Sequence, residues 1–287
     1  MEYLNPSPAS FLPQVMWLTY RTVMERPGLG ADDILELLAP AAMRQRTPRG
    51  DGVHVQRALD ALRHLSLVRS EDGRFTADRV TNAAAFLRVL RHRVVSPPDT
   101  FGPEFDAPDD LRRGLIWLLR QSPTKPLDFD LDVRPVTTAF TNDTRWNTFR
   151  PWCEVLGFGQ VVLGVLAGPG QKQGGGKLIP NPTGAVIDAI REPFGDPLPR
   201  DEQIPITQLV AFLRAEIPVL PGHPSATYDG LTGEADEALR ALGLALTSAE
   251  ERQILDMTYQ SDPSSVMALH DAHDGRPRYV STVTIRM

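Results

Sequence analysis

Residues 52–76 carry the pattern that most narrows the fold of this chain. An amphipathic helix is predicted from about Gly52 to Leu65, because apolar residues recur there at the spacing of a single helical face. Two short extended runs follow, Leu67–Arg69 and Arg74–Thr76, and the turn between them ends in Asp-Gly. The sequence therefore predicts a helix that leads directly into a two-stranded hairpin. The apolar face of the helix consists of Val55, Ala58, Leu59, Leu62 and Leu65.

Two further helices are predicted before this one. The first covers Phe11 to Glu25, and the second begins near Ala31 with two acids in its first turn, where they favour the positive end of the helix. Three helices followed by a hairpin are the order of a winged helix-turn-helix module, and the phrase Ala61–Val68 is typical of the exit from its third helix. We therefore predict a winged-helix module at residues 1–95, extended by a helix at about Thr81–Val94.

The same plan recurs more faintly along the rest of the chain. A second module is predicted at residues 104–192, where an aromatic-rich helix at Thr144–Leu156 precedes two extended runs joined by a glycine-rich loop. A third is predicted at residues 200–287, with helices at Thr207–Glu216 and Gly233–Leu242 before its extended segments. Repetition of one plan about every 90 residues favours an array over three unrelated folds. The expected fold class is mainly α with short β-hairpins, arranged as tandem winged helix-turn-helix modules.

The charge of the chain is divided unevenly between its two ends. Residues 1–95 hold 13 Arg, no Lys and 10 acidic residues, a local net charge of +3 within a total of -6. The remainder therefore carries -9. Because nonspecific affinity for DNA grows with the number of phosphates that are neutralised, we expect binding of double-stranded DNA by this chain alone to be weak and sensitive to salt. The acidic remainder is expected to bind other protein subunits.

Sequence readout is expected on the exposed side of the third helix, since that helix enters the major groove in such modules. Gln56 and Arg57 have the chemistry to contact adenine and guanine edges, while Arg69 and Arg74 on the hairpin suit phosphates. The alternative is that these polar side chains are only solvated, or face a partner protein. The complete set of predicted DNA-binding residues is His54, Gln56, Arg57, Arg69 and Arg74 in the first module, with Arg145, Asn147, Arg150, Lys172 and Lys177 in the second.

The sequence predicts no catalysis, no cofactor and no bound metal. Gly168–Lys177 has the composition of a phosphate-binding loop, but Gln171 stands where that motif needs a glycine, and Leu178 replaces the serine or threonine after the lysine. We predict a wing tip there instead. The single cysteine, Cys153, excludes internal disulfides and a cysteine-based zinc site within one chain. The cluster His270–Asp274 has no third group at a defined spacing, so a solvated loop is the simpler interpretation.

The chain is expected to be cytoplasmic. No stretch approaches the roughly 20 apolar residues that a membrane-spanning helix needs. Its first ten residues also lack a basic region followed by an apolar run, which a secretory signal would show.

The phrase from Phe11 to Arg74, followed by further helix-helix-hairpin units in a chain of about this size, resembles the DpdG component of bacterial gene clusters that insert 7-deazaguanine bases into DNA. The resemblance covers the general plan of the whole chain and rests on no catalytic signature. It implies an accessory protein of a DNA-modification and defence system, acting with ATPase or helicase-like and nuclease partners. The C-terminal two-thirds are acidic, which departs from the basic surface that DNA binding requires. No functional residue is carried over from the resemblance.

Three hypotheses about function remain open from the sequence. The first is a non-catalytic adaptor that binds DNA through its N-terminal module and recruits proteins through its acidic remainder. The second is a scaffold whose winged helices bind only protein. The third is a transcriptional regulator, against which the lack of an obvious ligand pocket or dimerisation helix counts mildly.

Overall fold

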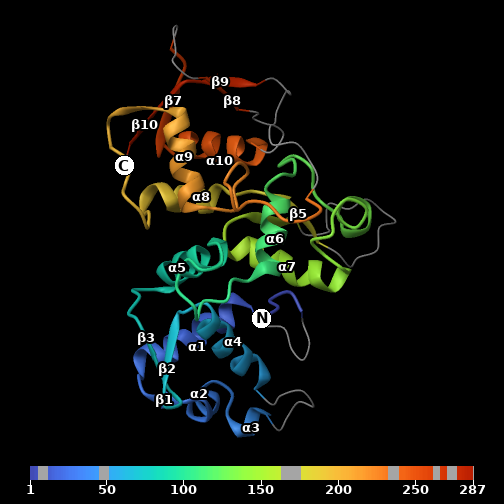
Figure 1. Ribbon diagram of the computed structural model, residues 1–287, viewed down its shortest axis with the longest axis vertical. Coiled ribbons are helices and arrows are strands. Elements are labelled where there is room, and N and C mark those ends of the chain that lie inside the picture. Colours follow the sequence, from blue (N-terminus) through green and yellow to red (C-terminus); the bar gives the residue numbers. More distant parts are fainter. Residues whose placement is uncertain are drawn as a thin grey trace. The chain divides into compact units, whose positions relative to one another are not determined.

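The chain forms two compact units, Met1–Leu111 and Arg112–Met287 (Figure 1). Helices make up most of the regular structure, and the strands are short and pair antiparallel, which confirms a mainly α fold with short hairpins. The computed structural model describes residues 1–5, 12–44, 52–162, 176–231, 239–260, 266–269 and 277–286.

The first unit contains the predicted helix and hairpin. Helix α4 (Val53–His64) is followed by strands β2 (Val68–Glu71) and β3 (Arg74–Ala77), which pair with each other, so this prediction is confirmed. Before them lie α1 (Pro13–Glu25), β1 (Leu29–Gly30), α2 (Ala31–Leu38) and α3 (Ala41–Arg44), and α5 (Ala83–Val95) follows. We call α1 to β3 the N-terminal repeat.

Strand β1 gives the N-terminal repeat a third strand that the sequence did not indicate. It pairs with β3, so the sheet order is β1-β3-β2 and Leu29 lies opposite Phe75. Two residues are too few to produce a visible alternation of apolar and polar side chains. Helix α1 packs on α4 and α2, and buries Met16 and Val23 completely in that contact layer. Strand β1 therefore fixes the start of α2 against the turn end of the hairpin.

A middle repeat opens the second unit. Its helix α6 (Asp109–Leu118) begins just before the unit boundary, and α7 (Asp143–Val155) leads into strands β4 (Gly159–Val162) and β5 (Lys177–Pro180), which pair as the sequence predicted. A π-helix, η1 (Phe129–Val133), lies between α6 and α7. Helix α7 continues through Pro151, whose missing N–H leaves one carbonyl of the preceding turn without its helical bond.

A C-terminal repeat completes the second unit. Helix α8 (Thr183–Arg191) packs on α9 (Ile206–Glu216) and α10 (Arg240–Glu251), as α1 packs on α2 and α4 in the first unit. Strand β6 (Gln203–Pro205) precedes α9, and β7 (Leu255–Thr258) follows α10. The last strand, β10 (Thr282–Ile285), lies between them in the order β6-β10-β7. A second hairpin, β8 (Met267–Leu269) and β9 (Arg278–Val280), stands between β7 and β10 in the chain.

The sheets of the three repeats share one register. In each, the final strand is central. Its second residue pairs with the residue that lies two positions before the second helix of the repeat, which is α2, η1 or α9. The first strand of each hairpin also pairs by its first residue with the last residue of the final strand. Such agreement fixes which residues are equivalent. The pairs at the first of these positions are Leu29 with Phe75, Leu127 with Leu178, and Ile204 with Val283.

The helix before each hairpin also ends in the same way. Its last turn is closed by a residue in the left-handed region, and the next N–H donates to a carbonyl five residues earlier, which is the Schellman arrangement. These left-handed residues are Ser66, Gly157 and Gln253, with φ of 53°, 76° and 58°. The bonds run from Leu67 to Leu62 at 2.8 Å, from Phe158 to Cys153 at 2.9 Å and from Ile254 to Ala249 at 2.9 Å.

We predict that Gly157→Ala lowers the free energy of unfolding by roughly 1 kcal/mol, because a Cβ is disfavoured in the left-handed conformation. At the equivalent positions, Ser66→Gly and Gln253→Gly remove that conflict, so we expect a change between zero and a gain of about 1 kcal/mol. Urea denaturation followed by circular dichroism measures all three. A neutral Gly157→Ala would show that the position tolerates a side chain and that the shared helix ending has little energetic weight.

Helix α10 departs from the sequence-based interpretation. A helix was expected at Gly233–Leu242, whereas α10 begins at Arg240 and runs on through Gly243 to Glu251. Gly243 is buried together with Leu242 and Leu246, so tertiary packing outweighs the weak helix propensity of glycine there. Most of the expected segment lies outside the described residues, so only its C-terminal limit can be compared. The three-module division stays a prediction, and α8, expected in the second module, packs on the C-terminal repeat.

Candidate nucleic-acid interface

Helices α4, α7 and α10 hold equivalent positions, each just before a hairpin. Counting back from the left-handed residue places Gln56 of α4, Asn147 of α7 and Gly243 of α10 at one position. Counting along the paired strands places Arg74, Lys177 and Thr282 at another, the start of the final strand. The N-terminal and middle repeats therefore share a carboxamide on the helix and a basic residue on the hairpin.

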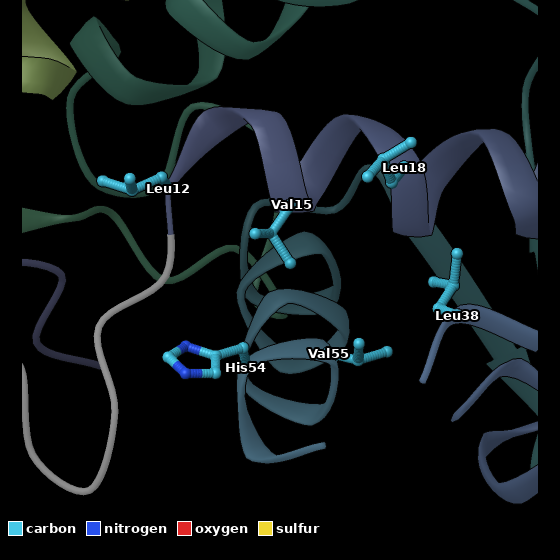
Figure 2. A pocket seen from close by; sticks show the side chains of 6 residues that line it. All are labelled: Leu12, Val15, Leu18, Leu38, His54 and Val55. Carbon is cyan, nitrogen blue, oxygen red and sulfur yellow. The ribbon is translucent and has the colours of Figure 1, made fainter. Parts of the chain in front are cut away.

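His54 and Gln56 are both exposed on α4. His54 lies beside an apolar hollow of about 430 Å³ between α1 and α4, which Leu12, Val15 and Leu18 line from the α1 side, as Figure 2 shows. Gln56 makes no side-chain hydrogen bond within the described residues. Of the predicted residues of this helix, Gln56 is therefore the one whose polar group is uncommitted.

Arg57 is turned toward the first residues of the chain. Its Nη1 donates to the carbonyl of Asn5 at 3.1 Å, and its Nη2 to that of Glu2 at 3.3 Å. Burial lowers the pKa of the Arg57 guanidinium. In the same segment Tyr3 is buried and donates to the carbonyl of Ala61 at 3.3 Å. Arg57 thus fastens the segment Met1–Asn5 to α4, and its predicted role at a guanine edge stays a prediction.

The two arginines on the first hairpin are exposed, and each has one polar partner within the described residues. Arg69 pairs with Asp78 at 2.5 Å, and both side chains are more than half exposed. Arg74 donates from Nη1 to the carbonyl of Gly28 at 2.8 Å, which ties the hairpin to the turn after α1. An exposed pair of this kind is worth little and exchanges readily for another anion. Both guanidinium groups therefore keep donors for a phosphate.

Two of the predicted residues of α7 contact each other. Arg150 donates from Nη2 to Oδ1 of Asn147 at 2.7 Å, and from Nη1 to the carbonyl of Gly176, the residue before β5. Burial lowers the pKa of the Arg150 guanidinium. Arg150 therefore holds α7 to its hairpin and orients Asn147. Arg145, one turn earlier, is half-buried.

Lys177 opens β5 and is half-buried. It lies near Asp132 of η1, whose Oδ1 forms an ion pair with Nζ of Lys125 at 2.5 Å. Burial alone would raise the pKa of Asp132, but the hydrogen bonds from Lys125 and the Asp128 backbone, with the charges of Lys125 and Lys177, lower it. Lys172 and the cluster His270–Asp274 lie outside the described residues.

The C-terminal repeat lacks these groups. Its positions equivalent to His54 and Gln56 are Ala241 and Gly243, both buried. Asp256 occupies the position of Arg69, so the charge is reversed, and it accepts from Nε of Arg286 at 2.5 Å. This correspondence leaves no recognisable pattern in the sequence, because the three repeats share few residues beyond the apolar ones. It follows from the shared helix ending and the shared strand register.

Metal-ligating clusters and membrane-spanning helices are both absent from the described part of the chain. No group of at least three His, Cys, Asp or Glu residues is placed there to hold a metal ion. No helix in the described ranges is long and apolar enough to cross a membrane.

The observed structure defines a mainly helical protein with helix-hairpin units, of which the first two carry polar and basic groups at matched positions. The chain belongs to the DpdG-like family, whose model matches residues 1–263. This membership confirms the resemblance and associates the chain with a DNA-modification system. No curated protein matches the chain. No solved structure matches it either.

Proposed function

We propose that this protein is a non-catalytic adaptor of a DNA-modification system that binds double-stranded DNA through its N-terminal and middle repeats and partner proteins through its C-terminal repeat. The observation that carries the proposal is the matched chemistry at equivalent positions, Gln56 with Asn147 and Arg74 with Lys177. In a winged-helix module the first pair lies on the helix that enters the major groove, and the second lies on the wing.

The sheet order supports assigning each repeat to the winged-helix class. A helix before the hairpin and a central final strand recur in all three repeats, and a short strand before the second helix occurs in two of them and is reduced to a single bridge at Leu127 in the middle repeat. The charge distribution supports a division of labour, because residues 1–95 carry +3, residues 96–182 carry -1 and residues 183–287 carry -8. An acidic repeat without a basic wing residue is repelled by phosphates, so a protein is the more suitable partner for it.

A protein-only scaffold is the second candidate function. It is favoured by Arg57 and Arg150, which contact the chain's own backbone carbonyls instead of standing free. A transcriptional regulator has no specific observation in its favour.

The proposed function is tested by titrating a fluorescent duplex with the full chain at increasing salt. We expect binding that weakens as salt rises from low to physiological strength, since neutralised phosphates release their counterions. The Arg69→Ala variant, which loses one exposed cation, should bind every sequence somewhat less well. Undetectable or salt-independent binding at low ionic strength would remove the DNA hypothesis and leave the scaffold.

A further inference from the structure

The two carboxamides on α4 and α7 differ in their surroundings but present the same chemistry. Gln56 is exposed and makes no side-chain hydrogen bond within the part of the chain that the structure describes. Asn147 is exposed and accepts from Arg150 through Oδ1. A guanidinium has only donors, so the atom that faces it must be the amide oxygen, and the amide nitrogen of Asn147 makes no hydrogen bond within the described residues.

A carboxamide discriminates between purines by pairing an acceptor with a donor. Adenine offers an amino donor and the N7 acceptor side by side in the major groove, whereas guanine offers two acceptors there. The amide oxygen and nitrogen of Gln or Asn match the first pattern. Against guanine, the amide oxygen would face another hydrogen-bond acceptor.

The residue after each carboxamide does not compete for the base. Arg57, which would favour guanine, spends both terminal nitrogens on Asn5 and Glu2. The equivalent residue in α7 is Thr148, which is buried and donates to the carbonyl of Thr144 at 3.0 Å. In both repeats the carboxamide is therefore followed by a side chain already bonded within the chain.

We infer that Gln56 and Asn147 are the base-reading side chains of their repeats and that each selects adenine. This inference rests on the proposed binding of DNA. It differs from that proposal because it specifies which base is preferred and which two side chains cause the preference.

The experiment selects preferred duplexes from a random pool with the full chain, and then measures affinity for them after single changes. We expect two preferred adenines in the selected site. The Gln56→Ala variant should lose the preference for one of them, and the Asn147→Ala variant should lose the preference for the other. Replacing a preferred adenine by 7-deazaadenine, which lacks the N7 acceptor, should weaken wild-type binding roughly tenfold. The same replacement should have no effect on the variant that lacks the matching reader.

Two further variants keep the test independent of folding. Gln56→Glu has the same shape but only accepts hydrogen bonds, so the preference at its position should move from adenine to cytosine. Arg74→Ala should weaken binding to all sequences alike and leave the adenine preference intact. Binding that shows no adenine preference, or a preference unchanged by all three Gln56 and Asn147 variants, would overturn the inference and leave DNA binding standing. Absence of any DNA binding would overturn both.

Discussion

Replacing Trp146 by alanine is expected to lower the free energy of unfolding of the second unit by about 3–5 kcal/mol, the cost of emptying a large core site. Trp146 is 2 % exposed, and its ring packs against three others at centroid distances of 5.2 Å to Phe140, 5.8 Å to Phe149 and 6.2 Å to Trp117. Helix α6 packs closely on the same aromatic cluster, which limits the movement of the surrounding rings into the space. A Cβ at Gly114 would lie 2.6 Å from the Phe149 ring.

Urea denaturation of the full chain, followed by circular dichroism, measures this loss. Trp17→Ala is the matched control, since Trp17 is only half-buried and packs on Phe86 at 5.3 Å in the first unit. We expect a smaller loss there, assigned to the first unit. An unchanged transition for Trp146→Ala would contradict the description of α7 as anchored by this aromatic cluster. The prediction bears on function, because Trp146 lies between the proposed DNA-binding residues Arg145 and Asn147.

The second large effect concerns the salt dependence of DNA binding. In the double variant Arg74→Ala/Lys177→Ala, the slope of log affinity against log salt should decrease by about 2, one for each phosphate contact removed. Affinity at low salt should fall for every sequence alike, because neither residue reads a base. A duplex titration at several salt concentrations gives both quantities.

The matched control removes two positive charges from the C-terminal repeat. Arg278 pairs there with Glu250, and Arg286 pairs with Asp256. Neither arginine occupies the position equivalent to Arg74, which is Thr282. Arg278→Ala/Arg286→Ala should leave the salt slope unchanged. An equal loss of slope in both double variants would mean that only net charge matters, which would contradict a defined contact at the two hairpins.

Part of the fold could be predicted from the sequence because its signals are local. Helix α4 and its hairpin follow from apolar spacing and an Asp-Gly turn, and β4 and β5 follow from two apolar runs. The short pairings of Leu29 and Leu127 could not be predicted, since one or two residues show no periodicity. The left-handed conformation at Ser66 could not be predicted either, because no glycine marks this position in the sequence.

The candidate interface was only partly predictable for a related reason. Residue chemistry singled out Gln56 and Asn147 separately, but their equivalence depends on the shared helix ending at Ser66 and Gly157, and no glycine marks the first of these. Chemistry also singled out Arg57 and Arg150, whose partners are backbone carbonyls that no sequence pattern identifies. Tertiary contacts thus decide which basic residues keep free donors.

Photo-crosslinking tests the central claim, that the first two repeats contact DNA and the third does not. A photoreactive residue is placed at Gln56, at Asn147 or at Thr247, a half-buried residue of α10 at the position equivalent to exposed Asp60 of α4. With a labelled duplex at low salt, we predict crosslinks from the Gln56 and Asn147 positions and none from Thr247. Crosslinks from Thr247, or from none of the three positions under conditions where the duplex is bound, would contradict the account.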